Sequence, residues 1–513
     1  MTKESESLES GHGVQVVTPN DEHRFELDED SLKELLLRDD IKHLPVVLVS
    51  VAGAYRKGKS FLLDFFLRYL DKTYNNGDDN SEWLGAPDEP LKGFTWRGGS
   101  ERHTTGIHLW SQPFKASLPT GEKVVILVMD TQGTFDSNST VKDNATVFAL
   151  STMLSSVQIY NLSQNIEEDD LQHLQLFMEY GRVAKDKMEG KPFQRLQFLI
   201  RDWSFPYDHP YGTVGGEQLL KKRLMVREDL HEELQGVRRD IDRCFEQVTC
   251  FLMPHPGLKV STDPNFNGRL SDIDPEFLKC LSELMPMLLA PENLVLKKIG
   301  GETVKARDLL NYFRTYLQVF NSDTLPTPTT ILEATAEANN TSALLEARAV
   351  YDKLMEEAAG ASMPYLRDEM LHQEHARALN KAMHAFNAKK KMGGEEMANS
   401  FRSQLVKSVE EMFVHLVEQN KAKCMYHMFT TPAVFAVLLV LGYLLSTLGE
   451  LFGMRLLASL GMCIVFVAVV LLAVWGYTRM TGNMREVGMQ LDQIAIQIRA
   501  YAPGAAQPKL KET

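Results

Sequence analysis

The segment VVLVSVAGAYRKGKSFLL, from Val46 to Leu63, decides the fold of this 513-residue chain. Its centre, GAYRKGKS at Gly53–Ser60, fits the pattern G-x-x-x-x-G-K-[ST] at every fixed position. The β-branched run before it predicts a buried strand, and the apolar residues after it predict a helix. Glycines let backbone N–H groups close around phosphate oxygens, and a helix N-terminus favours negative charge. The segment therefore predicts a nucleotide site in which Lys59 reaches the β- and γ-phosphates and Ser60 ligates Mg²⁺.

A second strand pattern supplies the other half of a phosphate and metal site. The run Val124–Met129 leads into Asp130-Thr131-Gln132-Gly133, where the carboxylate can hold Mg²⁺ through water. Gly133 lets the backbone approach the γ-phosphate. Between the two strands lies RGGSERHTTG, at Arg97–Gly106. Its threonines can complete the Mg²⁺ shell, so it is typical of a switch loop that becomes ordered with the γ-phosphate.

The sequence indicates less clearly which nucleotide base is bound. The usual Asn-Lys-x-Asp guanine signature is missing, and the chain offers Arg201-Asp202 after the strand pattern Phe198–Ile200. A carboxylate there can accept from N1–H and the exocyclic amine of guanine, a pair of donors that adenine lacks. An Arg-Asp pair alone has no specificity, so a surface ion pair and an ATP site both stay open. Arg56 likewise fits either an arginine finger supplied in cis or a solvated loop arginine.

Strand and helix patterns alternate through the first part of the chain. This order predicts an α/β GTPase domain, a mostly parallel sheet covered by helices, which we place at 23–322 after a disordered tail at 1–22. Two prolines between Leu325 and Thr329 predict a stiff linker at 323–330. Apolar residues at spacings of three and four then predict an all-α three-helix bundle at 331–424.

Two uncharged stretches near the C-terminus predict a transmembrane hairpin. The stretch 433–449 has seventeen residues and 456–477 has twenty-two, against the roughly 17–25 that a span needs. Lys and Arg residues precede the first stretch and follow the second, so the positive-inside rule places both termini in the cytosol. A buried helical hairpin in a soluble core is the alternative, but the pair is too long and too apolar for it.

The cytosolic tail at 478–513 carries one more helical pattern. Its apolar positions, spaced by four, three, four and three, are Val487, Leu491, Ile494, Ile498 and Tyr501. An amphipathic helix beside a span can lie in the membrane interface. Packing of this helix against the protein's own domains is the alternative.

Charge and cysteine content narrow the classes of function. The formal net charge of −13 argues against a general nucleic-acid binder, so no nucleic acid is expected as a partner. The five cysteines have no paired spacing, which indicates free thiols in a reducing compartment. Residues 1–22 contain no apolar run, so no secretory signal is expected there.

Together these motifs resemble the atlastins, dynamin-related GTPases that fuse membranes of the endoplasmic reticulum. The resemblance covers residues from about 40 to 490, and it extends to the order of the parts from GTPase domain to amphipathic tail. The motifs that carry it are GAYRKGKS, RGGSERHTTG, DTQGTFDS (Asp130–Ser137), RDWSFP (Arg201–Pro206) and PHPGLKV (Pro254–Val260).

The resemblance implies a role for each matching position. The implied guanine-nucleotide site consists of Gly53, Arg56, Lys57, Gly58, Lys59, Ser60, Phe61, Gln132, Arg201, Asp202, Val260 and Asp263. The implied Mg²⁺ ligands are Ser60, Thr104 and Asp130, and the implied catalytic residues are Arg56, Lys59, Thr104 and Gln132. Arg56 would be the arginine finger, and Thr104 would contact the attacking water. Position 263 departs from the pattern, which has Asn where this chain has Asp263.

The resemblance also implies what the whole chain does. GTP hydrolysis to GDP and phosphate would drive homotypic fusion of endoplasmic-reticulum membranes through a homodimer formed in trans, building a branched tubular network. The implied partners are a second copy of the chain, the lipid bilayer and other hairpin proteins that shape this organelle; pairing in cis stays open. One alternative is an interferon-type guanylate-binding protein, although the chain ends Lys511-Glu512-Thr513 without a prenylation box. Another is a GTP-switched tether or shaping scaffold without fusion activity.

Overall fold

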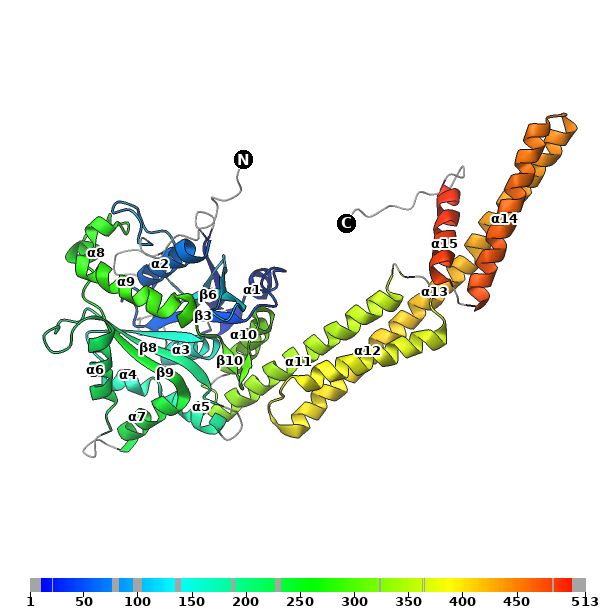
Figure 1. Cartoon of the computed structure of the whole chain (residues 1–513). Coiled ribbons are helices and arrows are strands. Elements are labelled where there is room, and N and C mark those ends of the chain that lie inside the picture. Colours follow the sequence, from blue (N-terminus) through cyan, green and yellow to red (C-terminus); the bar gives the residue numbers. More distant parts are fainter. Residues whose placement is uncertain are drawn as a thin grey trace. The chain divides into compact units, whose positions relative to one another are not determined.

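Figure 1 shows the chain in a computed structural model, which divides into two compact units. The sheet unit is Met1–Ser342 with Lys390–Ala398, and the helical unit is Ala343–Lys389 with Asn399–Thr513. The residues that the structure describes are 11–20, 22–75, 83–95, 104–133, 140–185, 190–226, 232–322, 324–361, 363, 365–481 and 484–500.

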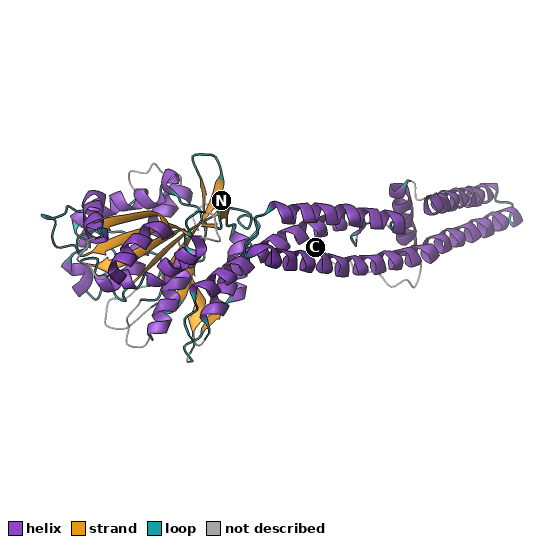
Figure 2. Cartoon of the chain, turned by 90° about the horizontal axis from the view of Figure 1, so that it is seen from below, coloured by secondary structure: helices purple, strands orange, loops and turns teal. Residues whose placement is uncertain are grey.

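The described residues of the sheet unit form a nine-stranded sheet with the order β2-β1-β4-β6-β3-β7-β8-β9, in which β5 also pairs with β6. The five neighbouring strands β6, β3, β7, β8 and β9 are parallel, which confirms the α/β class, and the other four add antiparallel pairs. One of these four, β1, lies within residues 1–22, so the expectation of a disordered tail is wrong for that part, because its backbone pairs with β2 and β4. Figure 2 shows the strands enclosed by helices. The strands are β1 Gly13–Pro19, β2 Phe25–Leu27, β3 Val46–Gly53, β4 Ile107–Trp110, β5 Phe114–Ser117, β6 Lys123–Thr131, β7 Val157–Ser163, β8 Phe193–Arg201 and β9 Phe245–Leu252, with β10 Lys298–Ile299 and β11 Glu302–Thr303 in a small second sheet.

Helices cover both faces of the large sheet because side chains alternate along each buried strand. In β3, Val47 and Val49 face the layer that contains α2 and α9, whereas Val46 and Leu48 face the layer that contains α3, α5, α7 and α10. Figure 1 shows α2 and α9 above the sheet and α5 and α7 below it. The helices of this unit are α1 Glu29–Leu36, α2 Lys59–Leu70, α3 Val141–Leu154, α4 Glu168–Gln172, α5 Gln175–Lys185, α6 Gly212–Leu224, α7 Glu232–Cys244, α8 Leu258–Thr262, α9 Pro275–Leu289 and α10 Ala306–Phe320.

The beginning of α11 (Pro328–Ala359) belongs to the sheet unit. Ile331 and Leu332 are buried in the core of that unit, and Pro328 occupies the first helical position, where its missing N–H is harmless. Asn340 fastens the loop before α13: its Nδ2 donates to the Met392 carbonyl (2.8 Å), and the Met392 N–H donates to its Oδ1 (3.1 Å). The sequence predicts the linker at 323–330. Because α11 begins at Pro328, the described non-helical residues of this linker are 324–327.

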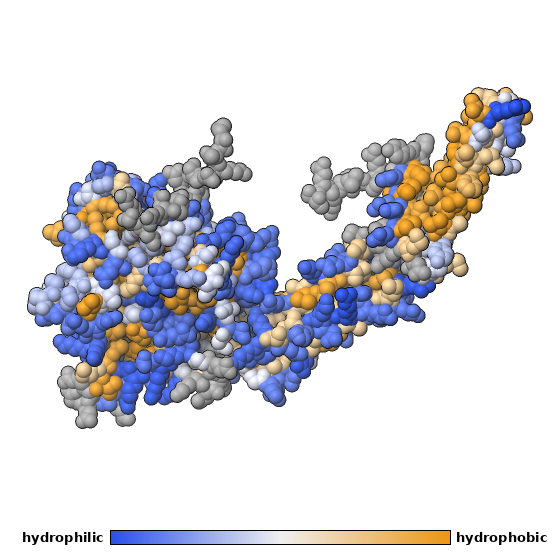
Figure 3. Space-filling model, in the orientation of Figure 1, coloured by the Kyte–Doolittle hydropathy of each residue, from blue (hydrophilic) through white to orange (hydrophobic). Residues whose placement is uncertain are grey.

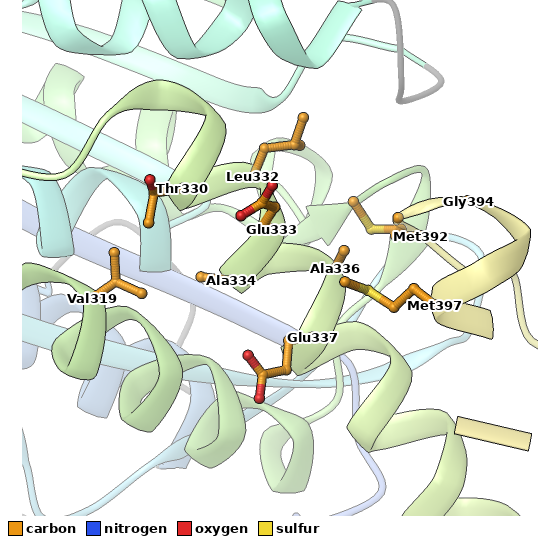
Figure 4. A pocket seen from close by; sticks show the side chains of 11 residues that line it. Val319, Thr330, Leu332, Glu333, Ala334, Ala336, Glu337, Met392, Gly394 and Met397 are labelled. Atoms are coloured by element: carbon orange, nitrogen blue, oxygen red, sulfur yellow. The ribbon is translucent and has the colours of Figure 1, made fainter. Parts of the chain in front are cut away.

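A pocket of about 700 Å³ lies within the sheet unit, between the start of α11 and the loop before α13. Figure 4 shows Glu333 and Glu337 of α11 beside Met392 and Met397, which come from the loop before α13 and its first turns. The pocket shares no residue with Gly53–Ser60, so it is separate from the predicted nucleotide site.

Three helices pack together in the helical unit, as the apolar spacings predict. They are the later part of α11, α12 (Asp368–Ala388) and the first part of α13 (Gly394–Leu451). Each contributes a row of residues at helical spacing to one buried core, whose members are Ala343, Ala347, Tyr351, Met355 and Ala359 of α11, Leu371, Ala378, Ala382 and Phe386 of α12, and Leu405, Val409 and Phe413 of α13.

The third bundle helix and the first apolar stretch form one continuous helix, α13, although the sequence patterns suggest separate segments at 331–424 and 433–449. Pro432 lies inside α13, where it removes one backbone hydrogen bond without ending the helix. Two segments, Phe429–Leu451 of α13 and α14 (Arg455–Thr481), are long and apolar enough to cross a membrane. Figure 3 shows their apolar surface as an extended orange region. Paired candidate transmembrane helices are thus present, as expected.

The tail helix α15 (Arg485–Ala500) packs against the base of this pair. Leu491 and Ala495 of α15 form a small buried cluster with Phe435 of α13 and Trp475 of α14. The structure thus supports packing of the tail helix against the protein's own helices, and its contact with a membrane interface stays a prediction.

Candidate nucleotide-binding site

The loop between β3 and α2 adopts a conformation that its glycines permit. Gly53 and Gly58 have φ values of +148° and +69°, and a Cβ on Gly53 would lie 2.2 Å from the Asn161 carbonyl oxygen. Arg56, exposed between them, also has a positive φ of +61°. The Asn161 side chain donates from Nδ2 to the Lys57 carbonyl (3.0 Å), which ties the loop to β7. The loop is thereby folded back over the end of the sheet as a cradle of backbone groups.

Lys59 begins α2 and is almost entirely buried. Its ammonium donates to the Ala54 carbonyl across the loop (3.1 Å). Burial lowers the pKa of Lys59 to about 8, against the opposing attraction of Asp130. Gly58 precedes the helix and offers no side chain to cap it, so the first N–H groups of α2 are left for an anion. A desolvated ammonium at a helix N-terminus is suited to hold phosphate oxygens.

Three side chains predicted to bind Mg²⁺ converge on one point. The Ser60 hydroxyl donates to Asp130 Oδ2 (2.6 Å), and the Thr104 hydroxyl donates to the same oxygen (3.3 Å). The two hydroxyl oxygens lie 3.3 Å apart. Burial raises the pKa of Asp130, and the hydrogen bond from Ser60 and the charge of Lys59 oppose that rise. The second carboxylate oxygen, Oδ1, is buried and has no hydrogen-bond partner among the described residues.

This donor set fits a magnesium ion. Mg²⁺ prefers hard oxygen ligands and keeps several of its waters, so it needs only a few protein oxygens. Ser60 and Thr104 offer hydroxyls, and the unpartnered Oδ1 of Asp130 offers an acceptor for a metal-bound water. When bound here, the ion would neutralise charge on the β- and γ-phosphates.

Gln132 fastens the end of the expected switch loop to β6. Its Oε1 accepts from the Gly106 N–H (2.9 Å), and its own N–H donates to the Gly106 carbonyl (2.8 Å). Gly133 follows at a close approach, where a Cβ would lie 2.3 Å from the Tyr55 Cα. Residues 104–106 are the described part of Arg97–Gly106; its residues 97–103 lie outside the described residues. The structure therefore places Gln132 between the switch loop and the phosphate loop.

Arg201 lies beside the phosphate loop. A Cβ on Gly58 would lie 3.5 Å from Arg201 Nη1, and the guanidinium carbon lies 5.3 Å from the centre of the Phe277 ring. Burial lowers the pKa of Arg201, and its Nε and Nη1 have no hydrogen-bond partner among the described residues. Asp202, half-buried, follows with a positive φ of +59°. A strained turn here would hold the carboxylate at the carboxyl end of β8, where ligands of parallel sheets bind.

The other base-site candidates lie around the short helix α8. Val260 is partly buried against the same apolar layer as Phe61, and Asp263 ends α8 and accepts from the Asn265 N–H (2.9 Å). Phe266 brings this loop to α2, because its ring centre lies 5.9 Å from that of Phe61. The Phe61 side chain itself is buried in the core, so its implied contact with nucleotide falls to its backbone.

Sequence reasoning missed several residues that support this site. Asn161 anchors the phosphate loop, and Gln15 donates from Nε2 to the Thr105 carbonyl (3.0 Å) at the end of the switch loop. Phe266 and Phe277 frame α2 and Arg201. These residues lie far from the motifs in the chain, and only the folding of the sheet brings them near. The signal that the sequence offers is a polar side chain within a buried strand, such as Asn161 in β7, and it is weak because Gln158 of the same strand is polar too.

Comparison with known proteins identifies both halves of this chain. The model of the guanylate-binding protein N-terminal domain matches residues 22–298, and that of the guanylate-binding protein C-terminal domain matches residues 300–427. Atlastin of Drosophila melanogaster is 53% identical over 94% of this chain and 90% of its own length. Atlastin-2 of Homo sapiens is 50% identical over 94% of this chain and 82% of its own length. Atlastin-1 of Bos taurus is 48% identical over 96% of this chain and 88% of its own length.

The similarity to these relatives covers 94–96% of the chain. The chain therefore belongs to the atlastin family, within the wider class of guanylate-binding-protein-like GTPases.

Proposed function

We propose that this chain hydrolyses GTP to GDP and phosphate and uses the hydrolysis to fuse membranes of the endoplasmic reticulum. One observation supports this most strongly. A single chain combines the phosphate loop and Asp130 site with two helices able to cross a membrane. Two proteins named Atlastin and Atlastin-2 are 53% and 50% identical to this chain over 94% of its length.

The proposed chemistry uses residues from three elements. Lys59 and the N-terminus of α2 hold the β- and γ-phosphates, and Arg56 swings onto the developing charge as an arginine finger. Ser60, Thr104 and Asp130, which lie within hydrogen-bond distance of one another, would hold Mg²⁺, and Thr104 would also contact the attacking water. Gln132 keeps the switch loop closed over the phosphates through its bonds with Gly106.

The base site must also distinguish guanine from other bases. We propose that Arg201 packs beneath the loop while Asp202 accepts from the two donors on the guanine edge, with Val260 and Asp263 at the border of the base pocket. A direct test exchanges Asp202→Asn and compares GTP with xanthosine triphosphate, which carries a carbonyl in place of the guanine amine. The expected result is lower turnover of GTP and higher turnover of the xanthine nucleotide. Unchanged preference would remove Asp202 from the base site.

The proposed membrane arrangement follows from the hairpin. With both large flanks in the cytosol, nucleotide-bound units on opposing membranes can pair as a homodimer in trans, while pairing in cis stays open. Hydrolysis would then move the helical bundle around the residues near Leu325 and draw the two hairpins together. Other hairpin proteins of the endoplasmic reticulum are proposed as further partners in building the branched network.

Lipid mixing between liposomes tests this proposal. Full-length protein is placed in donor and acceptor liposomes with GTP and Mg²⁺, and phosphate release is followed in the same samples. Mixing is expected for the unaltered chain and is expected to be lost in Lys59→Ala and in Arg56→Ala. The matched control is Lys221→Ala, which removes an exposed cation of α6 and should leave both activities unchanged.

Two further arms separate fusion from its alternatives. Protein in donor liposomes alone should hydrolyse GTP without mixing lipids between donor and acceptor liposomes, because bare acceptors offer no partner for pairing in trans. If liposomes carrying protein on both sides cluster and release phosphate but never mix lipids, the chain is a tether or shaping scaffold. If ATP supports turnover as well as GTP does, the assignment of the base site is wrong.

A further inference from the structure

The tail helix α15 meets the hairpin through a buried carboxylate. Asp492 is 5% exposed, and its Oδ1 accepts from Thr431 Oγ1 (2.7 Å) and from Trp475 Nε1 (2.9 Å). Its Oδ2 accepts from Arg479 Nη2 (2.5 Å). Thr431 belongs to α13, and the other two donors belong to α14. A carboxylate removed from water needs such partners, so Asp492 joins three helices at one point.

The cation in this contact reaches further, to the helical bundle. The Arg479 guanidinium lies 5.8 Å from the ring centre of Trp475 and 6.0 Å from that of Tyr365 in the loop between α11 and α12. Arg367, in the same loop, donates to the Met480 carbonyl at the end of α14 (2.8 Å). The base of the hairpin, the tail helix and the end of the bundle therefore share one polar cluster.

The face of α15 that packs on the hairpin differs from its apolar stripe. The buried positions are Gly488, Leu491, Asp492 and Ala495. The stripe that the sequence pattern marks is Val487, Leu491, Ile494 and Ile498. At about 100° per residue, the centres of the two sets differ by roughly 80° around the helix. Ile494 in particular remains 39% exposed.

We propose that Asp492 is a positioning residue, which fixes the rotation of α15 on the hairpin base so that Ile494 and Ile498 face the lipid surface, while Val487 and Leu491 pack toward the hairpin. Gly488 and Ala495 allow close contact on the docked side because their side chains are small. Ile494 and Ile498, the part of the apolar stripe outside the buried cluster, are then available to lipid. The helix serves two surfaces at once, one of protein and one of lipid.

Lipid is the occupant that the chain's own geometry favours for the stripe. α14 is apolar enough to span a membrane and ends at Thr481, and α15 begins at Arg485. So short a connection keeps α15 at the boundary where the span ends. Branched side chains exposed there gain free energy when headgroups and acyl chains replace water around them.

A disulfide between α14 and α15 tests the docking. A Cβ on Gly488 would lie 3.5 Å from the Thr478 Cβ, within the range that a disulfide needs. The double variant Thr478→Cys with Gly488→Cys, in full-length protein with Cys424 and Cys463 changed to Ala, should oxidise rapidly in liposomes. Adding Asp492→Leu should slow cross-linking at least tenfold, whereas Asp492→Asn, which retains an acceptor oxygen, should slow it less. The matched control is Glu486→Gln, which removes an exposed carboxylate of the same helix and should have no effect.

A second readout measures rotation, which a merely structural residue would not set. An environment-sensitive fluorophore is attached to Ile494→Cys or to Gln493→Cys, neighbours that point about 100° apart. In liposomes the label at 494 should be in an apolar environment and quenched by brominated lipid, and the label at 493 should be in water. Asp492→Leu should reduce the difference between the two labels.

Three outcomes would overturn the proposal. Cross-linking that is as fast in Asp492→Leu as in the parent means that the carboxylate does not hold the helix. An unchanged difference between the labels means that it does not set the rotation. Protection of the 494 label without quenching by brominated lipid means that protein, such as a second copy, covers the stripe. All measurements are made without nucleotide, so their failure is distinct from failure of the proposed GTPase and fusion activities.

Discussion

Asp130 and Asp492 are both buried carboxylates, but they differ in how many of their oxygens have hydrogen-bond partners among the described residues. Asp130 accepts two hydroxyl hydrogens on one oxygen, while its other oxygen has no partner among the described residues. Asp492 accepts from three donors, and both of its oxygens are used. Burying an unpartnered oxygen costs free energy that nothing in the surrounding protein returns. The unpartnered oxygen of Asp130 is typical of a ligand-binding site, whereas the fully hydrogen-bonded carboxylate of Asp492 is typical of a contact that holds helices together.

The same contrast extends to the cations near each carboxylate. Lys59 lies close enough to Asp130 to feel its charge, yet its ammonium donates to a backbone carbonyl. Arg479 donates directly to Asp492 and lies over two aromatic rings. Perturbed, incompletely partnered charges cluster at functional sites, whereas paired charges more often fix structure. Substitutions at the two places should therefore affect different properties.

The largest effect is expected at Arg56. If it acts as an arginine finger, Arg56→Ala should lower kcat for GTP by about 10³-fold or more, because the transition-state charge loses its partner. Nucleotide affinity should change little, since the arginine is exposed in the absence of ligand. Single-turnover phosphate release and binding of a fluorescent GDP measure the two quantities. Equal losses in both would make Arg56 a binding residue, and Arg56→Lys should recover only part of kcat because it lacks the planar fork.

A smaller effect is expected at Asp130. Asp130→Asn should lower turnover by about 100-fold and raise the Mg²⁺ concentration needed for half-maximal rate, because the carboxylate that orients the metal waters is gone. The free energy of unfolding without nucleotide should change little, since relief from burying a charge opposes the lost attraction to Lys59. Chemical denaturation and a magnesium titration of turnover check these expectations. A large loss of stability with normal magnesium dependence would make Asp130 a structural residue like Asp492.

The sequence was sufficient for the fold class and for the three bundle helices, for a physical reason. Glycines at 53, 58 and 133 are required by positive φ angles or close contacts, so the motifs carry their geometry in the residue types themselves. The bundle helices likewise follow from apolar spacing, because each buries one stripe. The predictions that rest on local chemistry are the ones that the fold reproduces.

The features that the sequence did not predict depend on contacts between residues far apart in the chain. The antiparallel side of the sheet uses strands as short as Phe25–Leu27, too short for a pattern to identify. Pro432 suggests a break that α13 does not have, since a helix can tolerate one lost hydrogen bond. The rotation of α15 is set by Asp492, and a periodicity count treats a buried charge as part of the exposed face.

A moderate effect is expected from Asp492→Ala. Arg479, Trp475 and Thr431 would lose their shared acceptor, and unpartnered buried donors cost about 1–3 kcal/mol. Local opening of α15 should become easier by an order of magnitude or so, seen as faster amide exchange within 487–499 in reconstituted protein. Exchange in α2 and the rate of GTP turnover in detergent should stay unchanged. Equal acceleration throughout the chain would show global destabilisation in place of a local contact.

The smallest effect is a proton taken up at Lys59. Because burial lowers the pKa of Lys59 to about 8, about half of the free protein carries a neutral lysine at pH 8. Bound diphosphate favours the charged form, so binding of GDP should draw about half a proton from buffer at pH 8 and about a tenth at pH 7. The sign follows from the raised pKa in the complex: affinity falls as pH rises above 8. Calorimetry in buffers of different ionisation enthalpy measures this uptake, and Lys221→Ala should leave it unchanged. Absence of uptake at pH 8 would mean that the loop already holds Lys59 fully charged.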